Sequence, residues 1–282
     1  MRIHLAGQIA DNFPQATLEK MKARGDGEMP ASGSSWLLCQ RSLVDERCNY
    51  SLVTYAYLRS IPLWADVWRE LPSCTIVDSG AFTAHTLGKA FTLDGYSAFI
   101  GEFSAEYGEL LDELHFMSLD VIGDAAATWR NFDELERRGH QIMPVLTIGS
   151  SDRDIDRAAE HGYFACGGLV GAKRGIVQAW LDSVFQRLLT RLELPKVHLL
   201  GVTQGWALER YPAFSSDSSS WKKPIHFGQS RLTGLPMIPR STIGSAEAAL
   251  ASESLRAELR HYRQLQDHTT ALWRERGIEW ES

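Results

Sequence analysis

Short apolar runs that alternate with longer amphipathic segments constrain the fold of this chain more than any other feature. Eight such runs lie between residues 3 and 218, each about the length of one strand. Longer segments with helical periodicity separate several of them, and the clearest is 177–192, whose apolar residues all fall on one helix face. Apolar strands joined by crossover-length segments are typical of a parallel sheet covered by helices. The predicted strands are 3–7, 51–58, 74–78, 115–123, 142–148, 163–169, 196–203 and 213–218.

Eight strands in 282 residues favour a (β/α)8 TIM-like barrel, and a doubly wound open sheet is the second choice. We expect a single domain over residues 1–282, because no internal repeat or linker is visible. Residues 11–46 show no strong periodicity and are predicted to form a long loop. A helix capped by Thr92 or Asp94 is expected near residue 95, and a last helix over about 245–276.

Charge and cysteine content limit the classes of function. The formal charge of −6 means that nucleic-acid binding would depend on a local basic patch. Four cysteines without a C-x-x-C pair fit reduced thiols. Metal-ligand spacing is absent from His85, His115, His198 and His226, which are expected in core or surface roles. Neither a signal peptide nor a membrane span is apparent. We therefore expect a cytoplasmic protein with no metal, no cofactor and no membrane partner.

Three aspartates follow apolar runs in unrelated segments. Asp78 ends "CTIVD", Asp120 ends "HFMSLD" and Asp217 ends "AFSSD". Active sites of parallel α/β folds lie at the carboxyl ends of the strands, so these positions predict three carboxylates at one rim. The small residues Ser79 and Gly80 after Asp78 would let a ligand approach the backbone.

Each of these features also has a purely structural interpretation. An aspartate after a strand is commonly a helix cap or a turn former, and one of the two acids in "SLDVIGD", Asp120 and Asp124, is expected to be structural. The segment "ACGGLVGAKRG" could cradle a phosphate, although glycine after a strand is usually a tight turn. The agreement of three strand ends favours a site over three independent turns.

Several motifs, in their order along the chain, resemble the tRNA-guanine transglycosylase superfamily. They are "VDSGAF", "SLDVIGD", "GYFACGGLVG", "KVHLLGV" and "YPAFSSDSSSW", which together extend over residues 78–221. The chain is most similar to the short phage-encoded branch, which is implicated in replacing guanine in DNA by 7-deazaguanine derivatives. The resemblance implies a (β/α)8 barrel, in agreement with the strand pattern.

The resemblance also implies roles for individual residues. Asp217 matches the nucleophilic aspartate of the family, Asp78 the aspartate that begins its D-S-G-G-F motif, and Asp120 a base-recognising aspartate. Gly168 and Leu169 match the G-G-L segment whose backbone contacts the base. The sequence departs from the family in "DSGAFT", which lacks the second glycine and the following glutamine, and in the missing zinc-binding cysteine segment. That second departure disfavours a tRNA substrate.

The chemistry of base exchange fits three carboxylates. One can form a covalent glycosyl-aspartate, a second can protonate the departing purine, and a third can accept from guanine N1–H and its amino group together. A base in a duplex must be flipped out, and Phe82 is the candidate stacking residue, with core packing as the alternative. The cations expected to hold the phosphate backbone, unless they are ordinary surface residues, are Lys173, Arg174, Lys222 and Lys223.

The leading hypothesis is therefore a DNA-guanine transglycosylase that exchanges guanine for a free 7-deazaguanine of the preQ0 type. A tRNA-modifying enzyme, a non-catalytic nucleic-acid-binding barrel and a sugar-phosphate enzyme are the alternatives. A non-catalytic barrel would not need Asp217, and only the Gly-rich loop with its Lys-Arg pair suggests a sugar phosphate. A homodimer or a partner subunit remains open as a further source of affinity.

Overall fold

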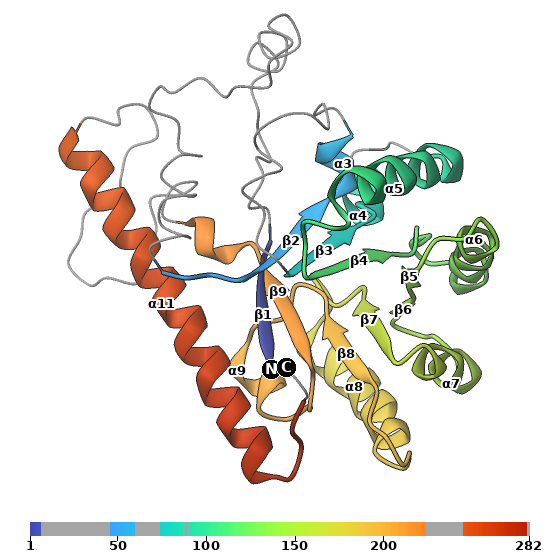
Figure 1. The fold of residues 1–282 in the computed structure, drawn as a ribbon. Helices are drawn as coiled ribbons and strands as arrows, with labels where there is room; N and C mark the ends of the chain where they lie inside the picture. Colours follow the sequence, from blue (N-terminus) through green and yellow to red (C-terminus); the bar gives the residue numbers. More distant parts are fainter. Residues whose placement is uncertain (7–45, 60–73, 87, 89–90, 224–244, 281–282) are drawn as a thin grey trace, which may run out of the picture.

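The computed structural model describes residues 1–6, 46–59, 74–86, 88, 91–223 and 245–280. Its centre is one sheet of parallel strands surrounded by helices, which is a TIM-like α/β barrel (Figure 1). The predicted loop over 11–46 lies outside the described residues except for Glu46. The strands are β1 (Arg2–Ala6), β2 (Tyr50–Thr54), β3 (Cys74–Asp78), β4 (Glu113–Met117), β5 (Ile142–Met143), β6 (Val145–Thr147), β7 (Tyr163–Gly167), β8 (Lys196–Leu199) and β9 (Ser215–Ser218).

The order of the strands around the barrel is β5-β4-β3-β2-β1-β9-β8-β7-β6. The predicted strand 142–148 is divided at Pro144, which has no N–H to donate to a ladder. Its first half pairs with β4 and its second half with β7. Since β5 and β6 are consecutive pieces of one segment, they join the two ends of the sheet and nearly close the ring. The eight predicted strands are thus present, one of them as two pieces. The predicted strand 51–58 was too long, because it ends at Thr54 and residues Tyr55–Leu58 form a short helix.

Helices follow most of the strands and cover the outside of the barrel (Figure 1). Helix α5 begins after Thr92, whose hydroxyl accepts from the Gly95 amide at 3.1 Å, so the first of the two predicted caps is the one used. The predicted C-terminal helix is present as the 31-residue α11. The helical elements are α3 (Tyr55–Leu58), α4 (Ala81–Thr86), α5 (Leu93–Tyr107), α6 (Ala125–Arg137), α7 (Asp152–Glu160), α8 (Arg174–Leu188), α9 (Gly205–Leu208), η2 (Ser220–Lys222) and α11 (Ser245–Glu275).

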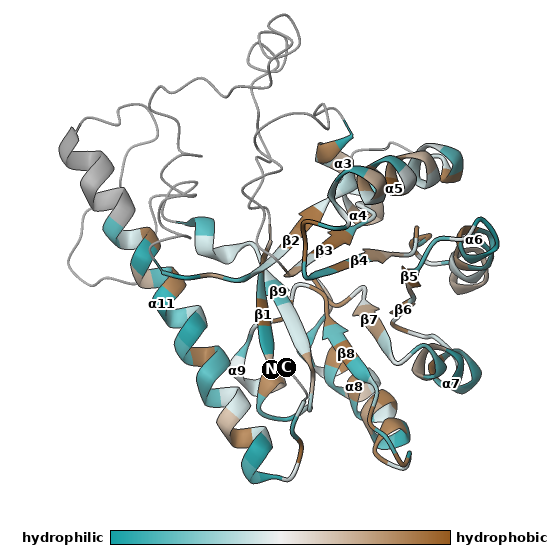
Figure 2. Ribbon diagram, viewed as in Figure 1, coloured by the Kyte–Doolittle hydropathy of each residue, from teal (hydrophilic) through white to brown (hydrophobic). Residues whose placement is uncertain are grey.

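Alternation along the strands separates two apolar layers. Val53, Val77 and Phe116 point outward into a large core that they share with the helices. A smaller buried cluster takes its residues from β1 to β7 and forms an inner layer: Ala6, Leu52, Ile76, Met117, Met143, Val145 and Ala165. Figure 2 shows β3 in brown and β9 nearly white, because β9 consists of three serines and Asp217. Strand β9 therefore brings polar groups into the barrel beside this apolar layer.

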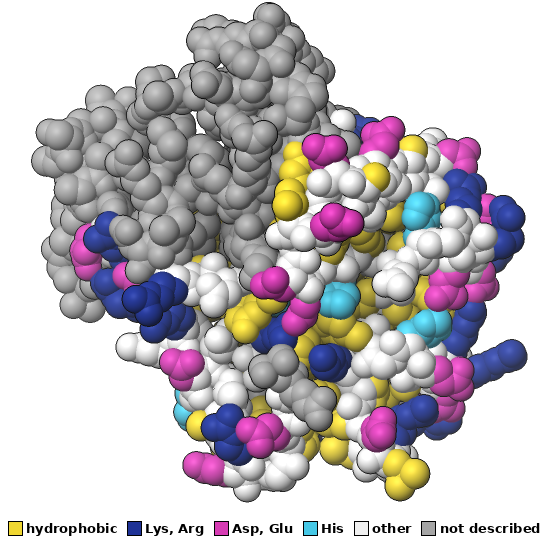
Figure 3. Space-filling model, in the orientation of Figure 1, with side chains coloured by type: hydrophobic (Ala, Val, Ile, Leu, Met, Phe, Trp, Pro, Cys, Tyr) yellow, Lys and Arg dark blue, Asp and Glu magenta, His cyan; other side chains and the backbone are white. Residues whose placement is uncertain are grey.

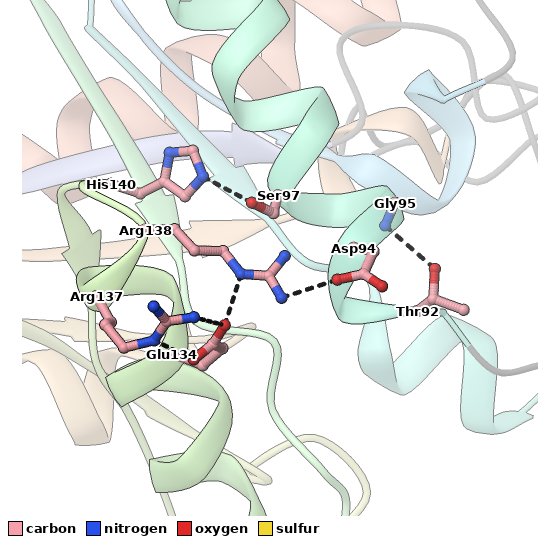
Figure 4. A network of polar contacts seen from close by, with 8 residues as sticks. All are labelled: Thr92, Asp94, Gly95, Ser97, Glu134, Arg137, Arg138 and His140. Carbon is pink, nitrogen blue, oxygen red and sulfur yellow. Dashed lines mark hydrogen bonds and ion pairs between the residues drawn. The ribbon is translucent and has the colours of Figure 1, made fainter.

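Two sets of contacts fix the helices in place. Helix α11 lies along β1, where the Met1 amino group donates to the Thr270 hydroxyl at 3.1 Å and the Ile3 amide donates to Gln266 at 2.9 Å. A network at the surface joins α5 to the end of α6 (Figure 4). In it the Arg138 guanidinium contacts both Asp94 and Glu134, each at 2.8 Å.

Candidate active site

The three predicted aspartates lie at the carboxyl end of the barrel. Asp78 is the last residue of β3 and Asp217 lies in β9, as expected. Asp120 lies three residues beyond the end of β4, so the predicted strand 115–123 was too long. The reason is local, because side chains of α6 take over the backbone groups that a strand would use. Asn131 donates to the Leu119 carbonyl at 2.8 Å, and the Thr128 hydroxyl accepts from the Val121 amide at 2.9 Å.

Asp78 is the acid most altered by its surroundings. Burial, the carboxylate of Asp120 and that of Asp217 together raise the pKa of Asp78 to about 7. Hydrogen bonds from the Gly80 amide and the Thr54 hydroxyl act in the opposite direction. Gly80 has φ +74°, and a Cβ there would lie 2.5 Å from Ala56 Cβ, which explains why glycine follows Ser79. Asp78 can therefore both hold and release a proton at a pH close to neutral.

Asp120 is held by a residue that was predicted to bind substrate. The Ser79 hydroxyl is fully buried and donates to Asp120 Oδ1 at 2.9 Å, so Ser79 acts on the site through this carboxylate. Burial raises the pKa of Asp120, and the Ser79 hydrogen bond opposes that rise. Asp124 is the structural member of the pair in "SLDVIGD", because its side chain accepts from the Ala127 amide at 2.8 Å and caps α6.

Asp217 has two donors on one oxygen. The Gly201 amide lies 2.6 Å from Asp217 Oδ1, and His198 Nε2 lies 3.3 Å from the same atom. The carboxylate and the histidine are both buried, at 6% and 0% exposure. Gly201 has φ +69°, a conformation that turns its amide toward the carboxylate.

The contact between His198 and Asp217 was not predicted from the sequence. His198 was expected in the core or at the surface, because the histidines lack metal-ligand spacing. The available signal was alternation: His198 and Leu200 occupy the same face of "KVHLLGV", and this strand pairs with the one that carries Asp217. A polar residue on the inner face of a barrel strand indicates a partner on the neighbouring strand.

The remaining predicted base-contacting residues surround the same end of the barrel. Phe82 is 57% exposed on α4, so its ring is not part of the core. Gly168 is exposed at the end of β7 with φ +71°, whereas the side chain of Leu169 is buried in the outer core. The backbone at Gly168 is thus accessible, while the buried side chain of Leu169 holds the segment in place.

The four predicted phosphate-binding cations have different environments. Lys173 and Arg174 are exposed at the start of α8, where the Arg174 guanidinium lies 4.7 Å from the centre of the Trp206 ring. Lys223 is exposed, but Lys222 is buried at 6% exposure. On the face drawn in Figure 3, basic and acidic side chains are interspersed. Exposed cations at this rim are therefore Lys173, Arg174 and Lys223.

The described residues contain neither a cluster that could hold a metal nor a helix that could span a membrane. Within those ranges no three histidine, cysteine or acidic side chains are grouped so that they could hold a metal ion. No helix in the described part of the chain has the length and apolar character needed to cross a membrane.

Comparison with known proteins adds little to this description. No family model matches the chain, and no curated protein matches it. One similar solved structure is that of a "putative fructose-1,6-biphosphate aldolase" from Coccidioides immitis. It is 11% identical, with a TM-score of 0.46 over 96% of this chain and 92% of that chain.

Proposed function

We propose that this protein is a base-exchange transglycosylase that replaces guanine in DNA by a free 7-deazaguanine of the preQ0 type. The observation that carries the proposal is the difference between the environments of two neighbouring acids. Asp78 has a pKa of about 7 and can serve as the acid. Asp217 receives two donors on one oxygen, which orients it as a nucleophile requires. The two differ in the way the acid and the nucleophile of a retaining glycosidase differ.

The reaction requires two displacements at C1′ of the deoxyribose. In the first, a carboxylate oxygen of Asp217 bonds to C1′ while the C1′–N9 bond breaks and the purine takes the proton of Asp78. In the second, the incoming 7-deazaguanine gives its N9 proton to the Asp78 carboxylate and its N9 bonds to C1′, which frees Asp217. Bonds and protons balance, and Asp78 returns to its protonated form. The oxocarbenium-like transition state is stabilised by the carboxylate of Asp217.

Asp120 supplies the selection of guanine in this scheme. A carboxylate can accept from N1–H and the exocyclic amino group together, a pair that adenine does not present. The Ser79 hydroxyl at 2.9 Å fixes the orientation of Asp120. Phe82 offers an exposed ring on which a flipped base can stack. Exposed Gly168 offers backbone to the same base.

DNA is the proposed polymer because the motifs resemble those of the DNA-modifying branch most closely. Lys173, Arg174 and Lys223 are the cations proposed to hold its phosphates. A tRNA substrate is the competing proposal, and the same experiment separates the two.

The test is denaturing electrophoresis of the protein after incubation with guanine-containing DNA or with tRNA, without a free base. We expect wild-type protein to form a slow-migrating adduct with DNA that 7-deazaguanine discharges, and mass analysis to find the new nucleoside in the DNA. Adduct and exchange with tRNA alone would replace the DNA assignment. No exchange with either polymer would refute the proposed function.

Variants assign the roles. Asp217→Ala should abolish both the adduct and base exchange, and Asp78→Asn should block base departure with DNA binding largely retained. Asp120→Asn should mainly reduce selection of guanine over adenine, on the order of tenfold or more. Asp124→Asn is the matched control, because it changes a nearby acid that caps α6. An Asp217→Ala protein that still forms the adduct would contradict the assignment of the nucleophile.

A further inference from the structure

A chain of buried polar groups runs from Asp217 into the barrel. His198 Nε2 lies 3.3 Å from Asp217 Oδ1, and the other ring nitrogen, Nδ1, lies 2.7 Å from the Ser215 hydroxyl. The Ser215 hydroxyl in turn lies 2.7 Å from the Tyr163 hydroxyl. Three strands contribute to this chain: β7, β8 and β9. Neither His198 nor Ser215 has measurable exposure to solvent.

We propose that His198 is a positioning residue, a neutral imidazole whose Nε2–H donates to Asp217, with the hydroxyls of Ser215 and Tyr163 completing the chain behind it. An ionised carboxylate only accepts, so the hydrogen of this contact must lie on Nε2. In a neutral ring Nδ1 then only accepts, and the Ser215 hydroxyl must donate to it. The Tyr163 hydroxyl must therefore donate to Ser215 Oγ. Every hydrogen in the chain is assigned by these steps.

Two further buried groups lie near this chain, and the positions of their hydrogens follow in the same way. From β1 the ring of His4 approaches, with 5.6 Å between the ring centres, and its Nδ1 lies 3.0 Å from the Ser51 carbonyl. A carbonyl accepts only, so Nδ1 of His4 carries its hydrogen, and burial lowers the pKa of His4 well below its usual range. Burial also raises the pKa of Tyr163, which keeps its phenol protonated as a donor. Among the described residues, the acid in hydrogen-bond contact with the His198 ring is Asp217.

The contacts of His198 and Gly201 determine which oxygen of Asp217 is free to react. The Gly201 amide and His198 both contact Oδ1, so this oxygen is held in place by two donors. Oδ2 is then the oxygen that bonds to C1′. Two donors on one oxygen also fix the plane of the carboxylate, which sets the angle of approach. This role of Oδ2 rests on the proposed base exchange, whereas the tautomer of His198 does not.

Nitrogen-15 NMR of the histidine side chains in the intact protein tests the tautomer directly. We expect the His198 signal, assigned by its loss in His198→Gln, to report a neutral ring protonated on Nε2. In Ser215→Ala the carboxylate that accepts from Nε2–H remains, so the ring should stay protonated on Nε2, and only the Nδ1 signal should shift because its hydrogen bond is lost. A cationic ring or an Nδ1-protonated ring in wild-type protein would overturn the proposal, whether or not base exchange is detected.

Kinetics test the effect on Asp217. His198→Leu, which lacks any donor, should lower kcat about 10- to 100-fold with KM nearly unchanged. His198→Gln can place an amide N–H where Nε2 lies and should keep activity within about threefold of wild type. His140→Gln is the matched control, since its Nε2 contacts Ser97 Oγ at 2.8 Å outside the barrel. Equal activity of the Leu and Gln variants would refute a donor role, and a melting curve verifies that both are folded.

Discussion

Two polar networks in this protein use similar chemical groups in opposite surroundings. One joins α5 to α6 at the surface and centres on Glu134, Arg137 and Arg138 (Figure 4). The other lies inside the barrel and leads from Tyr163 to Asp217. Two members of the first, Asp94 and Arg137, have side chains 85% and 72% exposed, whereas His198 in the second has no exposure.

The difference in exposure decides what each network can do. Water competes for every contact of the surface network, so a broken pair is replaced at little cost. Inside the barrel a lost partner leaves a buried donor or acceptor without a bond, which costs about 1–3 kcal/mol. The hydrogen bonds of the buried network are therefore restricted to one arrangement. That restriction keeps the carboxylate of Asp217 in a fixed position. The contrast leads to three predictions, from the largest expected effect to the smallest.

The largest effect is expected for the buried acid Asp78. Its pKa of about 7 lies above its ordinary value of 3.8. Between about pH 4 and 7 the folded state keeps a proton that the unfolded state has lost, so the free energy of unfolding falls as the pH rises through this window. Asp78→Asn should remove the decline and be more stable than wild type at pH 8, by on the order of 4 kcal/mol.

Urea unfolding at pH 4, 6 and 8 measures the free energy of unfolding of wild type and Asp78→Asn. At pH 4 the two proteins should be about equally stable, and they should separate as the pH rises. The control is Asp124→Asn, because asparagine caps a helix as well as aspartate does. Parallel pH profiles for wild type and Asp78→Asn would mean that the pKa of Asp78 is the same in the folded and the unfolded protein.

A smaller effect is expected at the glycine that faces Asp217. A Cβ on residue 201 would lie 2.3 Å from Val170 Cγ2, and φ there is +69°. Gly201→Ala should cost about 1 kcal/mol of stability and displace the amide that donates to Asp217, which should lower base exchange about tenfold. Gly139→Ala is a control at φ +87° with open space, beside the surface network, and should cost stability alone. Full activity of Gly201→Ala would show that the amide is dispensable.

The smallest effect is expected at the surface. Hydrogen bonds from Arg137 and Arg138 lower the pKa of Glu134 to about 2, so its contribution to stability is present above about pH 4.5 and is lost as the pH falls toward 2. Because the pair of Glu134 with Arg137 lies at the surface, where the Arg137 side chain is 72% exposed, Glu134→Gln should leave the melting temperature at pH 7 and the rate of base exchange close to wild type. A marked fall in the melting temperature or in the rate of base exchange would mean that the surface network contributes more to stability or activity than its exposure indicates.

Alternation and periodicity predicted most of the fold. Residues 74–78 form a strand with the predicted bounds, and Asp78 and Asp217 lie where strand ends were expected. What the sequence could not supply are contacts between side chains of one element and groups of another. The end of β4 depends on side chains of α6, and the burial of Lys222 depends on packing around η2. The pKa of Asp78 depends on acids 42 and 139 positions further along, which meet it only in the barrel.

The seam at Pro144 has a consequence for how this protein behaves at high concentration. An open sheet has two edge strands whose unpaired N–H and C=O groups can pair with another chain, which is a common route to aggregation. Here the two ends of the sheet are pieces of two and three residues, separated by a residue that cannot donate. Each piece is already paired on one side, and together they present too little free backbone to recruit a strand from a second molecule. The proline that interrupts the ladder thereby also protects the place where the ring is joined.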